Sequence, residues 1–351
     1  MTYDKNRQKN NWHVRINNYH LIRQELNKLS EEGLLKAFLQ INSQVSSLGN
    51  INALMQISKQ TVFIKAIYLS ELECLPENYL STTNFFQLPL YYQYGIGSLG
   101  FGAWRELSAQ QMASNWVLSG QCSYFPLLYQ WRIINIPPHT INSTILDSVE
   151  KEVSIWHKEP TICYRHLARH TGQKVLLLFL EHIPFTLHDW LLSIKKESLL
   201  SGTLFQEIDN ALTSIFSFIN KQGMQHFDAH FKNILTDGQQ VYLSDFGLAI
   251  SDQFKLSESE KTYFKQHQTY DQTYKAFFLI YWLIEYLLKP ELNSNKDFSI
   301  LLQEFTQKNT TDLPTYLKMF EHYLPIALRM DKFYQKLKAN LGSTPYPLND
   351  D

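Results

Sequence analysis

The sequence has 351 residues, with 32 Lys and Arg against 33 Asp and Glu, a net charge of −1, and 44% hydrophobic residues. This length and composition allow one large domain or two lobes with substantial cores, and they exclude a chain that is disordered throughout. The balanced charge excludes a general positive field, so we expect no binding to nucleic acid, and any polyanion must be bound at a local site.

Cysteine spacing and hydropathy predict the compartment. Cys74, Cys122 and Cys163 are odd in number and lack the spacing of metal ligands, which indicates a reducing environment without a disulfide framework. The polar N-terminus contains no apolar stretch of signal-peptide length. The most apolar run, residues 276–288, is too short to span a bilayer and carries Glu285. We therefore expect a cytoplasmic protein without a membrane span.

The first elements in chain order are a helix and a hairpin. Leucines at helical spacing over residues 19–40 predict an N-terminal helical extension. Two β-like runs, 51–57 and 61–69, flank a polar turn and predict a β-hairpin. Residues 103–118 then predict a helix, and residues 124–134 predict another strand.

The middle of the chain contains an insertion and a buried strand. Residues 141–170 have mixed helical periodicity and predict two inserted helices that are separated at Pro160. Residues 174–184 form a continuous apolar run, which predicts a buried strand. From there to the C-terminus the pattern is mostly helical.

This order of elements predicts an α+β fold with two lobes and a cleft between them. We assign residues 1–34 to the helical extension and residues 35–182 to an N-lobe, which is an antiparallel sheet with a helix and the inserted helices. Residues 183–351 are assigned to a mostly helical C-lobe; the resemblance described below implies that the N-lobe binds a nucleotide and that the C-lobe carries the catalytic loop, the metal site and the acceptor side.

One segment, "HFDAHFKNILTDGQQVYLSDFG", carries most of the candidate chemistry. Asp228 and Asn233 lie five residues apart before one short strand, and Asp245 follows the next strand, directly before Phe246 and Gly247. Phosphoryl transfer needs a carboxylate to orient and deprotonate the attacking hydroxyl, and hard oxygen ligands for Mg²⁺. The competing interpretation is that these residues only cap turns.

The pattern H-x-D-x-x-x-x-N followed by D-F-G resembles the protein-kinase-like superfamily, from about residue 35 to the C-terminus. The resemblance implies a two-lobed kinase fold, ATP and Mg²⁺ as cofactors, Asp228 as the catalytic base, and Asn233 and Asp245 as metal ligands. It also implies that Lys65 in "VFIK" holds the phosphates and that Glu106 in the helix 103–118 holds Lys65. Taken singly, Lys65 also fits an edge charge and Glu106 a partner of the helix dipole.

The resemblance extends to the nucleotide pocket. "FLEHIP" is similar to the hinge after the fifth strand, so the backbones of Glu181 and Ile183, on either side of His182, are expected to bind adenine. The loop before the hairpin has a single glycine, Gly49, and we expect Gly49 and Ser47 to cover the phosphates less closely than a glycine-rich loop does.

A second glycine motif is a weaker candidate. Gly95, Gly97, Gly100 and Gly102 satisfy G-x-G-x-x-G, but they follow Lys65, whereas the ATP loop of the family precedes the lysine. We expect them to set the direction of the helix that carries Glu106. The alternative is that backbone amides at the start of this helix contact a phosphate.

Departures from the family bear on the acceptor. Phe227 stands where many regulated protein kinases have arginine, and His230 stands where serine/threonine kinases have lysine and where aminoglycoside and choline kinases commonly have histidine. Only a short stretch of chain separates Gly247 from the apolar helix that starts at Tyr274, and it lacks an A-P-E motif, so there is little material to dock a peptide. These features favour a kinase that phosphorylates a hydroxyl of a small molecule. An atypical protein kinase, a catalytically weak kinase-like binding module and a transferase of AMP remain alternatives.

Overall fold

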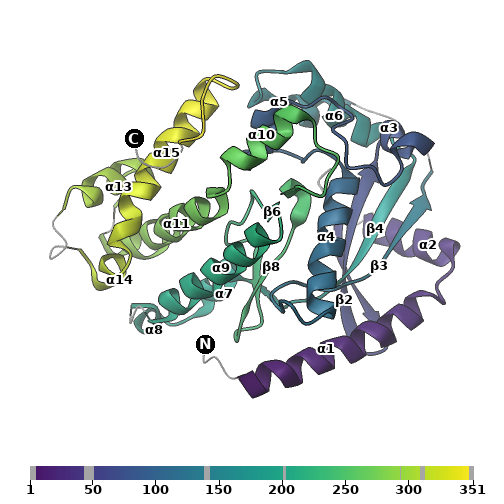
Figure 1. The fold of residues 1–351 in the computed structure, drawn as a ribbon, viewed down its shortest axis with the longest axis horizontal. Helices are drawn as coiled ribbons and strands as arrows, with labels where there is room; N and C mark the ends of the chain where they lie inside the picture. The colour runs from purple at the N-terminus through teal and green to yellow at the C-terminus, as the bar shows by residue number, and fades with distance from the viewer. Residues whose placement is uncertain are drawn as a thin grey trace.

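The structure is a computed structural model that describes residues 5–42, 51–137, 143–200, 203–292, 294–308 and 313–347. It is a mixed α+β protein with a small antiparallel sheet in its N-terminal part and a mostly helical C-terminal part (Figure 1). The predicted α+β class is therefore confirmed. Among the described residues, no helix is both long enough and apolar enough to cross a membrane.

The sheet consists of four antiparallel strands in the order β1-β2-β4-β3, which are Ile51–Ile57, Gln60–Leu69, Lys174–Glu181 and Leu128–Asn135. The hairpin predicted around residues 58–60 is confirmed, because β1 pairs with β2. In the pairing of β2 with β4, Lys65 lies opposite Leu178. Lys65 is thus placed in the middle of the sheet, on a strand with neighbours on both sides.

Both faces of the sheet are covered, which explains the continuous apolar run of β4. On one face, Leu176, Leu178 and Leu180 pack with residues of α4, Ala103–Leu118. On the other face, Leu177 and Phe179 pack with apolar residues of α1, Lys5–Leu26, and of α2, Glu31–Asn42. Successive side chains of a strand point to opposite faces, so the consecutive residues 175–180 inside β4 are all apolar. The helices predicted as an N-terminal extension are therefore packed on the sheet, and α2 continues past residue 34.

The insertion forms two helices as predicted, α5 (Ser143–Ser154) and α6 (Pro160–Thr171). Pro160 is the first residue of α6, where its missing N–H costs no hydrogen bond. Trp156, Val153 and Ile162 of this pair share a small separate core with Tyr92, which lies just before the glycines at 95–102. The insertion is therefore packed against the glycine segment.

The C-terminal part surrounds a central buried helix, α11, Tyr270–Leu283, which continues as one π-helical segment, Ile284–Leu288. Other helices pack around it: α7 (Leu187–Ser193), α8 (Lys196–Leu200), α9 (Thr203–Lys221), α10 (Glu258–Gln266), α12 (Lys289–Leu292), α13 (Phe298–Thr306), α14 (Thr315–Lys318) and α15 (Leu324–Ala339). Short strands beside it place the sequence motifs: β5 (Phe185–Thr186), β6 (Met224–Gln225), β7 (Ile234–Thr236), β8 (Val241–Leu243) and β9 (Ile250–Ser251). β7 and β8 are antiparallel neighbours, so the segments before β7 and after β8 lie at the same end.

Candidate active site

The loop between β6 and β7 carries Asp228 and has a constrained backbone. Phe227 has a φ of 67°, an unusual value for a residue with a large side chain. Asp271, in the first turn of α11, holds this conformation, because its carboxylate accepts hydrogen bonds from the backbone N–H groups of His226 (2.7 Å) and Phe227 (2.9 Å). Burial raises the pKa of Asp271 to about 6. The only signal for this residue in the sequence is its position as an acid shortly before the most apolar run, residues 276–288.

The imidazole of His226 connects the two motif segments. Its Nε2 donates to the backbone oxygen of Ser244 (2.9 Å), and its Nδ1 accepts from the backbone N–H of Asp228 (3.3 Å). Burial lowers the pKa of His226 to about 4, so the ring is neutral and keeps one donor and one acceptor. His226 therefore fixes the distance between the loop of Asp228 and the strand that leads to Asp245.

Asp228 is held at both carboxylate oxygens. Asn233 Nδ2 donates to Asp228 Oδ2 (2.9 Å) and to its backbone oxygen (2.9 Å), and the hydroxyl of Tyr274 donates to Oδ1 (3.4 Å). Burial raises the pKa of Asp228 well above its usual value, and the negative charge of Asp245 raises it further. Asp228 is therefore a positioned carboxylate with a higher proton affinity than an aspartate in water.

Lys65 lies between two carboxylates. Its Nζ is 2.6 Å from Glu106 Oε1 and 2.8 Å from Asp245 Oδ1. The side chains of Lys65 and Glu106 are 6% and 9% exposed, whereas that of Asp245 is 41% exposed. Burial works against the charge of Lys65, but the two carboxylates overcome it and raise its pKa. Burial alone would raise the pKa of Asp245, and the charge and hydrogen bond of Lys65 lower it.

Asp245 itself has a left-handed backbone, with a φ of 60°, and its Oδ1 accepts from the backbone N–H of Gly247 (3.3 Å). Such a conformation in a residue other than glycine is maintained by its surroundings and is common at functional sites. The structure thus brings together the predicted residues Lys65, Glu106, Asp228, Asn233 and Asp245, which come from four separate segments of the chain.

A cavity of about 470 Å³ opens beside these residues, and we call it the nucleotide cavity after the ligand that the sequence predicts for it. Apolar side chains line it on two sides: Leu54, Phe63, Leu180 and Leu235. The predicted hinge residues Glu181, His182 and Ile183 form its edge, and Lys65, Asn233 and Asp245 lie at its polar end. Its volume lies in the range of small-molecule sites. The backbone N–H of Ile183 has no hydrogen-bond partner among the described residues, so it is free to donate to a ligand.

Glu181 has a structural role that the sequence did not predict. Its carboxylate accepts from Arg15 of α1, at 2.8 Å from Nε and 2.7 Å from Nη2. Arg15 also donates to the backbone oxygens of Ser123 and Phe125. The prediction concerned only the backbone of Glu181, whose N–H donates to Leu127 O (2.8 Å). Ser47 and Gly49, predicted to cover the phosphates, lie outside the described residues.

The glycine segment 95–102 packs directly against the catalytic groups. A side-chain carbon on Gly95 would lie 2.5 Å from Asp228 Oδ1. Gly100 has a φ of +73°, and a side-chain carbon on it would lie 2.1 Å from the backbone oxygen of Gly247. These glycines are therefore required for close approach to Asp228 and to the segment that follows Asp245.

The first backbone N–H of α4 is bound by a side chain of the protein itself. The first helical N–H, that of Ala103, donates to Glu73 Oε1 (2.7 Å), and Glu73 is fully buried. Arg165 of α6 lies 3.5 Å from the other carboxylate oxygen of Glu73. Of the amides considered as phosphate contacts, that of Ala103 is therefore already bound to a carboxylate of the protein itself.

A small cavity of about 110 Å³ lies under the glycine segment. Charged groups of opposite sign line it: Glu106, Asp228 and Asp245 on one side, Arg165 and Arg169 of α6 on the other. The inserted helices thus bring two guanidinium groups near the catalytic carboxylates. Nothing in the sequence pattern of residues 141–170 predicted this.

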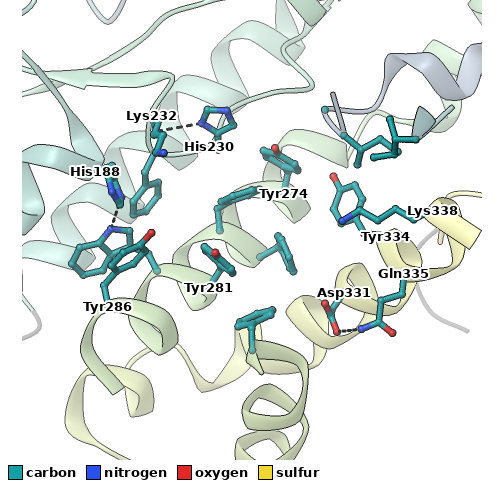
Figure 2. Close-up of a pocket in the computed structure, with 18 residues that line it drawn as sticks. His188, His230, Lys232, Tyr274, Tyr281, Tyr286, Asp331, Tyr334, Gln335 and Lys338 are labelled. Atoms are coloured by element: carbon teal, nitrogen blue, oxygen red, sulfur yellow. Dashed lines mark hydrogen bonds between the residues drawn. The ribbon is translucent and has the colours of Figure 1, made fainter. Parts of the chain in front are cut away.

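A further cavity of about 550 Å³ lies on the other side of the catalytic loop (Figure 2). We call it the aromatic cavity, because nine of its lining residues are aromatic: Phe231, Tyr274, Phe277, Phe278, Tyr281, Trp282, Tyr286, Phe298 and Tyr334. Lys232 lines both this cavity and the nucleotide cavity. The two cavities therefore meet beside the loop that carries Asp228.

No protein-family model matches the chain, and a search of curated proteins finds no match. Among the described residues, no group of three or more His, Cys, Asp or Glu side chains is arranged to hold a metal ion. A metal at this site would be held by Asn233 and Asp245 together with oxygen atoms that the protein does not supply. The donor set of one carboxylate and one carboxamide suits Mg²⁺, which keeps waters and binds phosphate oxygens.

Proposed function

We propose that the protein is an ATP- and Mg²⁺-dependent phosphotransferase with the two-lobed architecture of the protein-kinase-like superfamily. The observation that carries the proposal is the double ion pair of Lys65. Its partners Glu106 and Asp245 come from a helix and from a segment 180 residues away in sequence, in the order that the motifs require. Removing a lysine and two carboxylates from water costs free energy. A protein that keeps these three charges together in its interior therefore offers a candidate functional site.

The chemistry assigned to Asp228 is general-base catalysis. The hydroxyl oxygen of the acceptor forms a bond to the γ-phosphorus of ATP, its proton passes to the carboxylate of Asp228, and the bond from the γ-phosphorus to the β–γ bridging oxygen breaks to release ADP. The raised pKa of Asp228 suits this role, because a base works best when its pKa approaches the working pH. Asn233 keeps one oxygen of this carboxylate oriented through its amide nitrogen.

The residues fit a magnesium ion. The amide nitrogen of Asn233 is used by Asp228, which leaves the amide oxygen for the metal, and the Asp245 side chain is exposed toward the nucleotide cavity. When bound, Mg²⁺ would neutralise charge on the phosphate oxygens. Lys65 would contribute a positive charge to binding of the phosphates, with Glu106 keeping its ammonium group in place.

Ligand-dependent melting tests nucleotide binding. For an ATP-binding enzyme, MgATP at about 100 times its dissociation constant stabilises the folded state by ~2.7 kcal/mol. We expect this shift for the wild type and for Asp228→Asn, and we expect Lys65→Met to lose it. A wild type that melts at the same temperature with and without MgATP or MnATP would refute the enzyme proposal and favour the kinase-like binding module.

Turnover tests the chemistry. We expect Asp228→Asn to lower ADP release by about 10²–10⁴-fold while MgATP still binds. Unchanged turnover in this variant would refute the role of Asp228. The mass added to the acceptor separates phosphorylation, which adds ~80 Da, from transfer of AMP, and a labelled peptide in place of a small molecule would favour the atypical protein kinase.

A further inference from the structure

We propose that the aromatic cavity is the acceptor site and that its substrate is a small alcohol with a planar aromatic ring, uncharged or anionic. This inference rests on the proposed phosphotransferase function, and it names the class of compound that the enzyme phosphorylates. It excludes two other classes of hydroxyl acceptor, the polycationic aminoglycosides and the non-aromatic polyols.

The first argument is the position of the cavity relative to Asp228. Three of its lining residues contact the carboxylate. The hydroxyl of Tyr274 is 3.4 Å from Asp228 Oδ1, His230 Nε2 is 3.7 Å from the same oxygen, and Gly95 lies directly against it. Lys232 joins the cavity to the nucleotide cavity. Asp228 itself lines the small cavity of about 110 Å³, so a hydroxyl at this end of the aromatic cavity lies next to the residues that contact the base.

The second argument is that the aromatic side chains surround space instead of filling it. Tyr274, Phe278 and Tyr281 of α11 lie along one wall, with ring centroids 4.5 Å apart for Tyr274 and Phe278 and 5.8 Å apart for Phe278 and Tyr281. Tyr334 of α15 extends this wall beside Tyr274, with ring centroids 6.3 Å apart (Figure 2). A protein core packs such side chains without voids, whereas about 550 Å³ stays open here.

The aromatic walls are held in place, so the cavity is preformed. Trp282 Nε1 donates to His188 Nδ1 (3.3 Å), and the ring of Phe298 on α13 packs edge-on against Tyr281 at 5.0 Å. Aromatic rings bind other planar rings by offset stacking and edge-to-face contacts, which these fixed orientations offer. A ligand with a planar ring therefore gains contacts that a puckered sugar ring cannot make.

The third argument is charge. Two lysines line the cavity, Lys232 near Asp228 and Lys338 at the far end, against one carboxylate, Asp331. Gln335 Nε2 donates to Asp331 Oδ2 (2.9 Å), and burial raises the pKa of Asp331, which weakens it as a partner for a cation. His188, which also lines the cavity, has a pKa lowered by burial and is neutral. With Asp228 beside the cavity, the two lysines face two carboxylates, so a polycation would meet no excess of negative charge.

The test compares four hydroxyl compounds as ligands and as phosphoryl acceptors: 2-(4-hydroxyphenyl)ethanol, adenosine, glucose and kanamycin. Binding is measured by calorimetry in the presence of Mg²⁺ and a non-hydrolysable ATP analogue, and transfer is measured with γ-labelled ATP. We expect at least one of the two planar alcohols to bind and to become labelled, and glucose and kanamycin to do neither.

Variants locate the binding in the cavity. We expect Tyr281→Ala to weaken binding of the planar alcohol at least tenfold, and Tyr281→Phe, which keeps the ring, to bind within twofold of the wild type. Tyr164→Ala serves as the control, because Tyr164 is an exposed ring on α6 outside all three cavities. All three variants should bind MgATP as the wild type does.

The outcomes separate this inference from the proposed function. Binding of glucose or kanamycin in preference to both planar alcohols, no binding of either planar alcohol at millimolar concentration, or unchanged binding in Tyr281→Ala would overturn the acceptor class. If MgATP still shifts the melting temperature in those cases, the phosphotransferase proposal stands. If MgATP produces no shift, that proposal fails whatever the planar alcohols do.

Discussion

Replacing Gly95 by alanine should damage turnover without affecting ATP binding. The new methyl carbon would lie 2.5 Å from Asp228 Oδ1, whereas a carbon and an oxygen in contact normally stay about 3.3 Å apart. The carboxylate or the glycine segment must therefore move by about 0.8 Å, the difference between these two distances. Because a displacement of about 1 Å in a reactive group costs roughly 10²-fold in rate, we expect turnover to fall by about that factor.

The assay is basal ATP hydrolysis, in which water takes the place of the acceptor hydroxyl, together with the melting shift caused by MgATP. Gly95 does not line the nucleotide cavity, so the shift should equal that of the wild type. Gly33→Ala in α2 is the matched control, since it makes the same chemical change far from the site and should keep full turnover. Turnover of Gly95→Ala within twofold of the wild type would refute the reasoning that this glycine positions Asp228.

Three further predictions concern charge. Lys65→Met leaves two carboxylates without their cation and should lower the free energy of unfolding, measured by urea titration, by about 3 kcal/mol. Lys261→Met removes a lysine from an exposed surface pair and should leave the free energy of unfolding unchanged. Equal effects of the two substitutions would contradict the argument that burial makes the Lys65 pairs costly to break. The raised pKa of Asp228 means that the folded state binds a proton on this carboxylate more tightly than the unfolded state does. The stability that protonation of Asp228 contributes is therefore present at acid pH and is lost as the pH rises. Asp228→Asn should therefore gain stability relative to the wild type from about pH 4 toward neutral pH, and a pH-independent difference would exclude this account. Arg15→Ala should destabilise the protein by about 3 kcal/mol, because it leaves the carboxylate of Glu181 without its cation. Arg15→Lys should restore only part of the lost stability, since lysine cannot donate two parallel hydrogen bonds from a planar group. Full recovery of stability with lysine would show that the positive charge alone is sufficient.

The parts of the site that the sequence predicted are those encoded by local pattern and chain order. The helix at 103–118 and the strand that starts at 174 have periodicities and flanking residues that mark them, and the structure has α4 and β4 there. The pairing of Lys65 with Glu106 followed from the order of the motifs and is confirmed as a contact. The cofactors, the reaction and the two-lobed kinase architecture remain predictions.

The parts that the sequence did not predict depend on contacts between distant segments. Arg15 and Glu181 are 166 residues apart, and no local pattern connects them. Glu73 lies 30 residues before the helix that it caps at Ala103, so a search for a capping residue next to the helix misses it. The aromatic cavity could not be predicted either, because aromatic residues at helical spacing usually indicate a filled core, and only the packing of α11, α13 and α15 leaves space between them.

The contacts of Arg15 bear on how small a working version of this protein can be. Besides Glu181, the guanidinium lies over the ring of Tyr242 on β8, at 5.3 Å, so α1 touches both the sheet and the segment that leads to Asp245. A version trimmed to start after α1 would keep every motif of the candidate site and lose the helix that connects the two parts. The first helix therefore belongs to the minimal functional unit, even though a comparison of motifs alone would place the start of that unit after it.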